Sequence, residues 1–104
     1  MADLTKQFDA AMLDVYLRAK TEANYTASEF HNMLARQGGL ATAKQLINAS
    51  KPSEGYTRLY ERGFLNLTVE AVVVENPRWH PLFSEDEIDK ARSRLDDYGY
   101  KPST

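Results

Sequence analysis

The histidines and carboxylates are the residues of this sequence whose side chains could bind a metal ion or transfer a proton. His31 and His80 belong to no H-x-x-x-H or H-E-x-x-H motif, the spacings that bring two imidazoles to one metal ion on a helix. Glu70 and Glu75 could in principle act as an acid and a base, but helix surfaces carry such pairs routinely. We therefore predict structural roles for these side chains and no metal site.

Motifs for nucleophilic catalysis and phosphate binding are also missing from the sequence. The chain contains no cysteine, which excludes disulfides, thiolate zinc sites and a cysteine nucleophile. Ser53 and Ser84 lack the G-x-S-x-G and S-x-x-K contexts of serine nucleophiles and are better explained as helix caps. The pair Gly38-Gly39 fits neither glycine-rich phosphate motif. The sequence therefore predicts a protein that is not an enzyme and that binds no cofactor.

Basic residues are concentrated in the middle of the chain, over residues 36–62. Two predicted helices in this region, 40–48 and 54–62, could form a helix-turn-helix-like pair that binds nucleic acid. Their connection is longer than the usual turn of about 3–4 residues in that motif, and the net charge of −2 gives no general attraction to nucleic acid. We keep nucleic-acid binding as the alternative hypothesis, with these candidate contacts: Lys44, Lys51, Arg58 and Arg62.

Amphipathic aromatic residues favour a different function, that of a binding module. Tyrosine and tryptophan suit protein interfaces because they combine a large apolar ring with one polar atom. The same residues could equally form the rim of a small core. A small domain without catalytic groups acts by contact, so we predict an unknown protein partner or self-association. The aromatic residues are Tyr16, Tyr25, Tyr56, Tyr60, Tyr98, Tyr100 and Trp79.

Length and composition indicate one globular domain that spans residues 1–104. A chain of this length buries roughly two-thirds of its unfolded surface, which is enough for a single core. Its 42% hydrophobic and 27% charged residues are ordinary values for globular proteins. The N-terminal residues lack the pattern of a secretory signal, and no apolar run approaches the length that spans a membrane. We expect a cytoplasmic protein with no membrane association.

Capping residues in the first half of the chain predict three helices. Asp3 is a good N-cap for a first helix that runs toward Glu22. Thr26 and Glu29 have the spacing of a capping box and predict the start of a second helix. The glycine pair that follows predicts its end, and a short third helix is expected over residues 40–48. Together with the second half of the chain, this gives an all-α domain of about five to six short helices.

The central helix has the clearest local signals for its start and its end. Ser53 follows a proline and is placed to act as the N-cap. Gly63 stands where the helix needs a residue in the left-handed conformation, which glycine adopts without steric cost. Phe64 can then fold back onto Leu59, the contact that accompanies a Schellman motif.

The next stretch, residues 67–74, could form either a strand or a helix. Its four valines favour a strand, whereas a capping residue at Asn66 or Thr68 and apolar residues at helical spacing favour a helix. The sequence offers no second strand to pair with it, so we predict a short buried helix that ends before Pro77. Pro77 and Pro81 predict that residues 78–83 are not helical. The apolar residues of this segment are expected to cover the core.

The last helix repeats the signals of the earlier ones. Ser84 and Glu87 form a second capping-box pattern, and the acids in its first turn suit the helix dipole. Gly99 predicts the same glycine stop as Gly63. The final residues, Lys101–Thr104, are predicted to form a flexible tail.

The second half of the sequence contains four linked motifs: Gly55-Tyr-Thr-Arg-Leu-Tyr-Glu-Arg-Gly63, Leu65-Asn-Leu-Thr-Val-Glu-Ala71, Leu-Phe83 and Tyr98-Gly-Tyr100. In these motifs the chain resembles a family of small bacterial proteins of unknown function. The family pattern reads near G-[FY]-T-R-L-[WY]-E-x-G-x-L-[DN]-L-[ST]-V-E, and the resemblance extends over nearly the whole chain. It carries no assigned activity, so it implies no catalytic residue. Relatives that occur alone or attached to larger bacterial proteins imply an accessory or interaction role.

Polar residues of this pattern that a core does not require are the candidate functional surface. The alternative is structural: Arg58 and Glu61 pair across one helical turn, and Glu70 caps or braces a neighbouring helix. The candidate surface consists of Thr57, Arg58, Glu61, Arg62 and Glu70.

Overall fold

The computed structural model describes residues 3–100, and within that range the chain folds into α-helices and 3₁₀ helices with no strand. The expected all-α fold is therefore confirmed. The predicted tail, Lys101–Thr104, lies outside the described residues. The elements are α1 (Leu4–Glu22), α2 (Ser28–Gln37), α3 (Gly39–Asn48), α4 (Glu54–Glu61), the 3₁₀ helix η1 (Leu65–Leu67), α5 (Val69–Glu75), the 3₁₀ helix η2 (Pro77–Leu82) and α6 (Glu85–Asp97).

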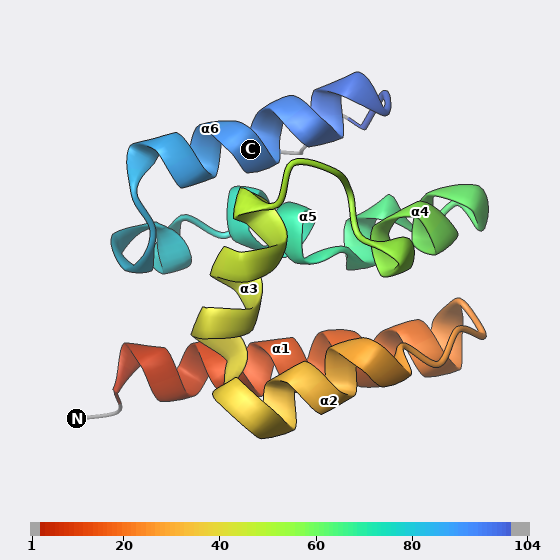
Figure 1. The fold of residues 1–104 in the computed structure, drawn as a ribbon, viewed down its shortest axis with the longest axis horizontal. Helices are drawn as coiled ribbons and strands as arrows, with labels where there is room; N and C mark the ends of the chain where they lie inside the picture. The colour runs from red at the N-terminus through yellow and green to blue at the C-terminus, as the bar shows by residue number, and fades with distance from the viewer. Residues whose placement is uncertain (1–2, 101–104) are drawn as a thin grey trace.

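The helices form two layers that α3 connects (Figure 1). Helices α1 and α2 run antiparallel and make one layer, while α4, α5 and α6 with the two 3₁₀ helices make the other. Helix α3 crosses from the first layer to the second and packs against α1 and α2 at one end and α5 and α6 at the other. The radius of gyration is 12.6 Å, close to the value of about 13 Å expected for a single domain of this size.

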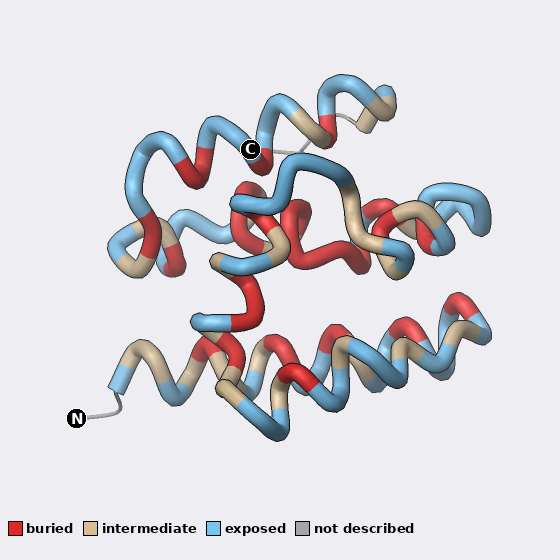
Figure 2. The backbone as a smooth tube through the Cα atoms, viewed as in Figure 1, coloured by how far each residue is buried: buried red, intermediate tan, exposed pale blue. Residues whose placement is uncertain are grey.

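The core lies between the layers, on the inner faces of the helices (Figure 2). Phe8 of α1 is fully buried, and its ring meets the rings of Trp79 and Phe83 edge-on, with centroids 5.2 and 5.5 Å apart. Edge-to-face contacts of this kind stabilise a core beyond simple area burial. The expectation that the segment after Pro77 covers the core is confirmed by these contacts.

Both predicted glycine stops are present with the full Schellman pattern. Gly63 has a φ of 80°, and the amide of Phe64 donates to the carbonyl of Leu59 at 2.8 Å. Gly99 has a φ of 77°, and the residue after it returns in the same way onto α6. Three predicted N-caps, at Asp3, Ser53 and Ser84, also accept hydrogen bonds from the first turns of their helices.

The valine-rich stretch forms a helix, as predicted, and not a strand. Thr68 caps α5 through a hydrogen bond that its Oγ1 accepts from the amide of Ala71 at 3.2 Å. The preceding turn, η1, was not anticipated. Helix α5 packs against α3, α6 and both 3₁₀ helices, so almost all of its surface is buried. This burial on all sides explains why its sequence shows so little alternation between apolar and polar residues.

Two local predictions are wrong. Thr26 does not cap α2, which begins at Ser28 with Ala27 at the N-cap position and no side-chain cap. The reason is that Tyr25 packs with the apolar cluster around Leu59, while the amide of Ser28 already bonds to the backbone carbonyl of Thr26. Tertiary packing therefore sets where this helix starts.

The second error concerns residues 77–82, which form η2 although their prolines predicted a non-helical segment. Pro77 stands at the first position, where no amide donor is required. The amides of Trp79 and Phe83 close the turns onto Asn76 and His80, both at 3.0 Å. Pro81 has no amide to donate, so this short helix lacks one bond to the third residue back, and it is closed by the turns on either side of that position.

Helix α3 is anchored at both ends by acidic side chains of other helices. At its start, Asp9 of α1 accepts a hydrogen bond from the amide of Gly39 at 2.7 Å. A Cβ atom at Gly39 would lie 2.8 Å from the carboxylate and 2.9 Å from the Cα of Asp9, so only glycine fits here. At its end, Glu87 of α6 accepts from Lys44 at 2.8 Å and from Asn48 at 2.7 Å.

Candidate functional site

The residues predicted to form a functional surface on and just after α4 are mostly held by contacts within the protein. The Thr57 hydroxyl donates to the carbonyl of Ser53 at 3.3 Å. Arg58 lies 3.7 Å from both Glu54 and Glu61, which confirms the predicted pairing across one helical turn. These side chains are all more than half exposed, so the ion pairs contribute little stability.

The four cations proposed to contact nucleic acid do not act as a group. Arg62 donates to the carbonyl of Ala23 at 3.1 Å and fastens α4 to the turn after α1. Lys44 is held by Glu87, whereas Lys51 is exposed and has no partner among the described residues. Helix α4 packs mainly against η1, and α3 packs mainly against α1, α2, α5 and α6, so the two do not form the closely packed pair of a helix-turn-helix.

Glu70, the remaining predicted residue, belongs to a buried ion pair. It is only 2% exposed, and its carboxylate accepts a hydrogen bond from Nη1 of Arg94 on α6 at 2.9 Å. The same guanidinium donates to the carbonyls of Leu46 and Ala49 at the end of α3, at 3.0 and 2.7 Å. The pair therefore ties α5, α6 and the end of α3 together, in agreement with the predicted bracing role.

Burial changes the proton affinity of the groups around this pair. Loss of solvent raises the pKa of the Glu70 carboxyl, and the ion pair with Arg94 offsets part of that increase. Burial also raises the pKa of the Tyr56 hydroxyl, which donates to the backbone carbonyl of Arg94 at 3.0 Å. Tyr56 therefore keeps its proton and serves as a hydrogen-bond donor.

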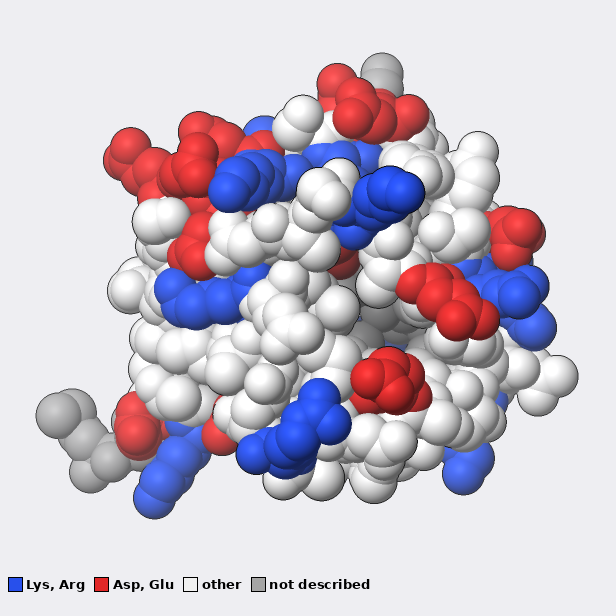
Figure 3. Space-filling model, viewed as in Figure 1, with Lys and Arg blue, Asp and Glu red and all other residues white. Residues whose placement is uncertain are grey.

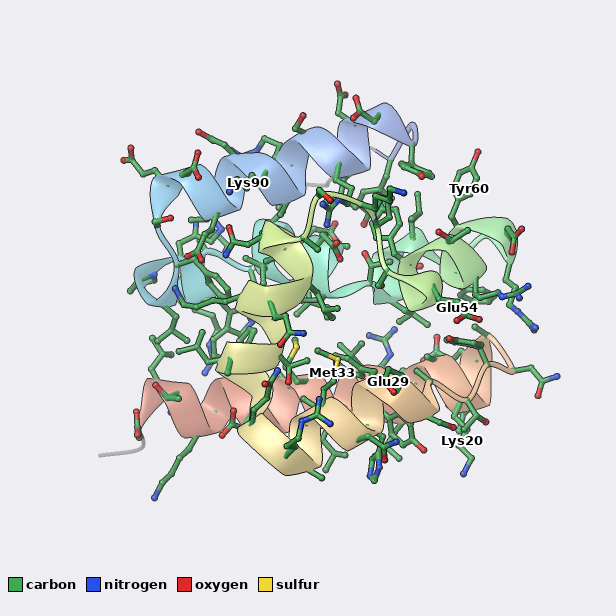
Figure 4. The ribbon with its side chains drawn as sticks, viewed as in Figure 1. Lys20, Glu29, Met33, Glu54, Tyr60 and Lys90 are labelled. Atoms are coloured by element: carbon green, nitrogen blue, oxygen red, sulfur yellow. The ribbon has the colours of Figure 1, made fainter. Side chains whose placement is uncertain are left out.

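A cleft opens between the two layers, beside this ion pair. Its walls come from α1 and α2 on one side and from α4, η1 and α5 on the other, and its volume is about 130 Å³. Most of the lining is apolar, with Met33 of α2 facing the space in Figure 4. The other principal apolar walls are Val15, Phe30, Leu59 and Leu67.

Two carboxylates flank the mouth of the cleft. Glu29 projects from α2 and Glu54 from α4, and the two residues face each other across the opening (Figure 4). The space-filling view shows the hollow between these two acidic side chains (Figure 3). The lining contains no lysine or arginine. Glu29 makes no hydrogen bond or ion pair within residues 3–100, so one mouth carboxylate is free.

Tyr25 and Gly55 complete the mouth. A Cβ atom built at Gly55 would lie 3.8 Å from the ring and from the hydroxyl of Tyr25, an ordinary contact distance. Burial raises the pKa of the Tyr25 hydroxyl, and the nearby Glu54 carboxylate raises it further. This hydroxyl therefore stays protonated, and no hydrogen bond joins it to the described part of the chain.

The buried polar groups beside the cleft are paired within the protein. Within the described residues every buried side-chain nitrogen or oxygen has a hydrogen-bond partner, and Glu70 is already neutralised by Arg94. Residues 3–100 contain no group of three histidine, cysteine or carboxylate side chains able to hold a metal ion. Nor does any helix in this range have the length and apolar character to cross a membrane.

Comparison with models of known protein families, with curated proteins and with solved structures finds no match. The assignment of a function therefore depends on the geometry of the cleft. Sequence reasoning identified Glu70 as a candidate but missed Glu29, Met33 and Glu54, which come together only in the fold. A weak signal existed, because both mouth acids occupy the first turn of a predicted helix.

Proposed function

We propose that this protein is a non-catalytic binding module that holds one apolar side chain of a protein partner in the cleft between its two helical layers. The observation that supports the proposal is the cleft itself, a mostly apolar space of about 130 Å³ that stays open between the two helical layers. Cores normally close such spaces, because unfilled volume costs stability.

The size of the cleft favours a side chain over a cofactor or metabolite. Pockets for small-molecule ligands usually enclose about 300–1,000 Å³, whereas an apolar cavity on the order of 150 Å³ takes up a molecule the size of benzene. A space of about 130 Å³ therefore suits one phenylalanine, leucine or methionine side chain. Protein interfaces commonly use one such anchor residue in a fitted pocket.

The proposal can be tested with N-acetyl-phenylalaninamide, a neutral compound that carries a single phenylalanine side chain. We expect weak but saturable binding, with a Kd on the order of 5–80 mM, because burial of one such side chain is worth roughly 1.5–3 kcal/mol. The ¹³C-methyl resonance of Met33 should shift, while that of Met12, which is fully buried outside the cleft, should not. Absence of a saturable shift at Met33 would contradict the proposal.

A blocked mouth provides the matched control. Gly55→Leu extends a side chain along Tyr25 across the opening, whereas Gly55→Ala adds only a methyl group that the site accommodates. We expect Gly55→Leu to abolish the Met33 shift and Gly55→Ala to preserve it. Because both residues fit a helix at this position, circular dichroism should show folded protein in each case.

Nucleic-acid binding remains the alternative hypothesis, and no feature of the fold favours it over the cleft. A gel-shift assay with short duplex and single-stranded DNA at low and moderate salt separates the two. Salt-sensitive binding that Lys51→Glu and Arg58→Glu weaken would support the alternative. We also propose a bacterial origin, from the resemblance described above, and a cytoplasmic location, which suits a chain without cysteine.

A further inference from the structure

The acidic mouth of the cleft restricts which partner can bind there, if the cleft binds a partner side chain as proposed above. We infer that the partner is a protein segment in which a bulky apolar residue is followed or preceded by lysine or arginine. The apolar residue would fill the cleft, and the adjacent cation would lie between Glu29 and Glu54.

The charges at the mouth are not cancelled by the lining of the cleft. Glu29, Glu54 and Glu70 are its acidic members, and it has no basic member. Glu70 is neutralised by its buried pair with Arg94, so the lining carries two net negative charges at the opening. A cation placed there would gain from both.

Two arginines outside the lining, Arg58 and Arg62, lie near the opening and reduce this field, but each is also engaged by other groups. Arg58 contacts Glu54 only at 3.7 Å, is shared with Glu61, and is 53% exposed. Exposed pairs of this kind are weak and exchange readily. Arg62 is held by backbone carbonyls of the turn after α1 and stacks over the ring of Tyr25.

The helix dipole accounts for an acid in the first turn of α2 and of α4, but not for the position of both acids at one opening. Glu85 provides the comparison, because it also lies in a first turn, that of α6, and does not line this cleft. The two mouth carboxylates differ from Glu85 in having an apolar space of side-chain size between them. An amphipathic ligand with a cation next to its apolar group matches both parts.

A protein source for the cation is favoured over a free amine by the dimensions of the site. The space holds about one aromatic ring and leaves no room for a charged group inside it. The carboxylates lie outside, at the surface, where a flanking residue of a partner chain would pass. A small aromatic amine would place its ammonium group closer to the ring and deeper in the cleft.

The test compares three blocked dipeptides, N-acetyl-Phe-Lys-amide, N-acetyl-Phe-Gln-amide and N-acetyl-Phe-Glu-amide, by titration of the Met33 methyl resonance. We expect the lysine dipeptide to bind about 2- to 5-fold more tightly than the glutamine dipeptide, which is the effect of exposed charge pairs. The glutamate dipeptide should bind most weakly. The differences should shrink at high salt.

Variants identify the carboxylates responsible. The double variant Glu29→Gln, Glu54→Gln should bind all three dipeptides equally, whereas Glu85→Gln should keep the preference for lysine. Equal binding of the three dipeptides to the unaltered protein would overturn this inference and leave the proposed function intact. Binding of none of them would overturn both. Much tighter binding of phenethylammonium than of the lysine dipeptide would identify a free amine as the ligand and overturn the choice of a protein partner.

Discussion

Replacement of Arg94 by methionine tests whether the buried ion pair organises the upper layer of the molecule. The substitution keeps a long apolar stem and removes the guanidinium that Glu70 requires. Glu70 would then be a buried carboxylate with no cation near it, because it is 2% exposed and its hydrogen bond to Arg94 would be lost. The carbonyls of Leu46 and Ala49 would also lose their donor.

The expected loss of stability is large for a domain of this size. Removing one partner of a buried pair costs about 3–5 kcal/mol, and native domains are stable by only about 5–15 kcal/mol. Arg92→Met is the matched control, since Arg92 lies on the same helix, is 53% exposed and pairs with Asp89 only at 3.5 Å. That control should cost less than about 0.5 kcal/mol.

The loss should also depend on pH, in a direction that follows from the carboxyl group. The folded-state pKa of Glu70 is raised by burial, so its protonated form stabilises the fold at low pH and the contribution is lost as pH rises through the raised value. Without Arg94, only the backbone hydrogen bond of the Glu70 carboxylate offsets this effect. Arg94→Met should therefore be more destabilised at pH 8 than at pH 5.

Urea unfolding followed by the fluorescence of Trp79, the only tryptophan and a buried residue, measures both effects. The double variant Glu70→Leu, Arg94→Met provides a second measurement where Arg94→Met is too unstable at pH 8, because it removes both charges and should recover much of the stability. Equal losses for Arg94→Met and Arg92→Met, or a loss independent of pH, would refute the reasoning.

Three further predictions concern the ends of α3 and the stop of α4. Gly39→Ala should lower the free energy of unfolding by about 1–3 kcal/mol in urea titrations, because the added Cβ meets Asp9 at 2.8 Å; an unchanged midpoint would show that α1 and α3 can separate freely. The pKa of Glu87 is lowered to about 2, against the desolvation that burial imposes, chiefly by the hydrogen bond from Lys44. The contribution of Glu87 to the free energy of unfolding is present above the unfolded pKa of 4.5 and is lost as pH falls toward 2. Glu87→Gln should therefore cost about 1–3 kcal/mol at pH 7 and little at pH 2, as measured by acid titration followed by circular dichroism. A cost that is the same at low pH would contradict this prediction. Gly63→Ala should cost about 1–2 kcal/mol in thermal melts through its φ of 80° alone, since no atom lies within 4 Å of the new Cβ; no change in melting temperature would contradict the left-handed stop.

The fold could be predicted wherever the signal and its target lie within a few residues of each other. The stop at Gly63 and the caps at Ser53, Thr68 and Ser84 each act on their own first or last turn, and all four are present in the structure. Thr26 shows the limit of such signals. Its capping pattern is as clear as that of Ser84, but the packing of the neighbouring tyrosine moves the start of the helix.

The candidate site could not be predicted because its parts are distant in sequence. Glu29 and Glu54 are separated by a whole helix, and nothing in the local sequence of either places them at one opening. The contact between Asp9 and Gly39 spans 30 residues, and the pair of Glu70 with Arg94 spans 24. Each residue had a sufficient local explanation, as a helix cap, a surface charge or a glycine stop.

The length of helix α3 sets the distance between the two helical layers, and therefore the width of the cleft between them. The helix connects the two layers, and hydrogen bonds hold one end to Asp9 and the other to Glu87. Its ten residues span about 15 Å. Shortening or lengthening it would change the separation of the layers without altering most of the cleft walls. The width of the opening thus depends on a helix that contributes only Leu46 to its lining. If the cleft holds a partner side chain as proposed, deletions or insertions in α3 would change the size of the side chain that fits.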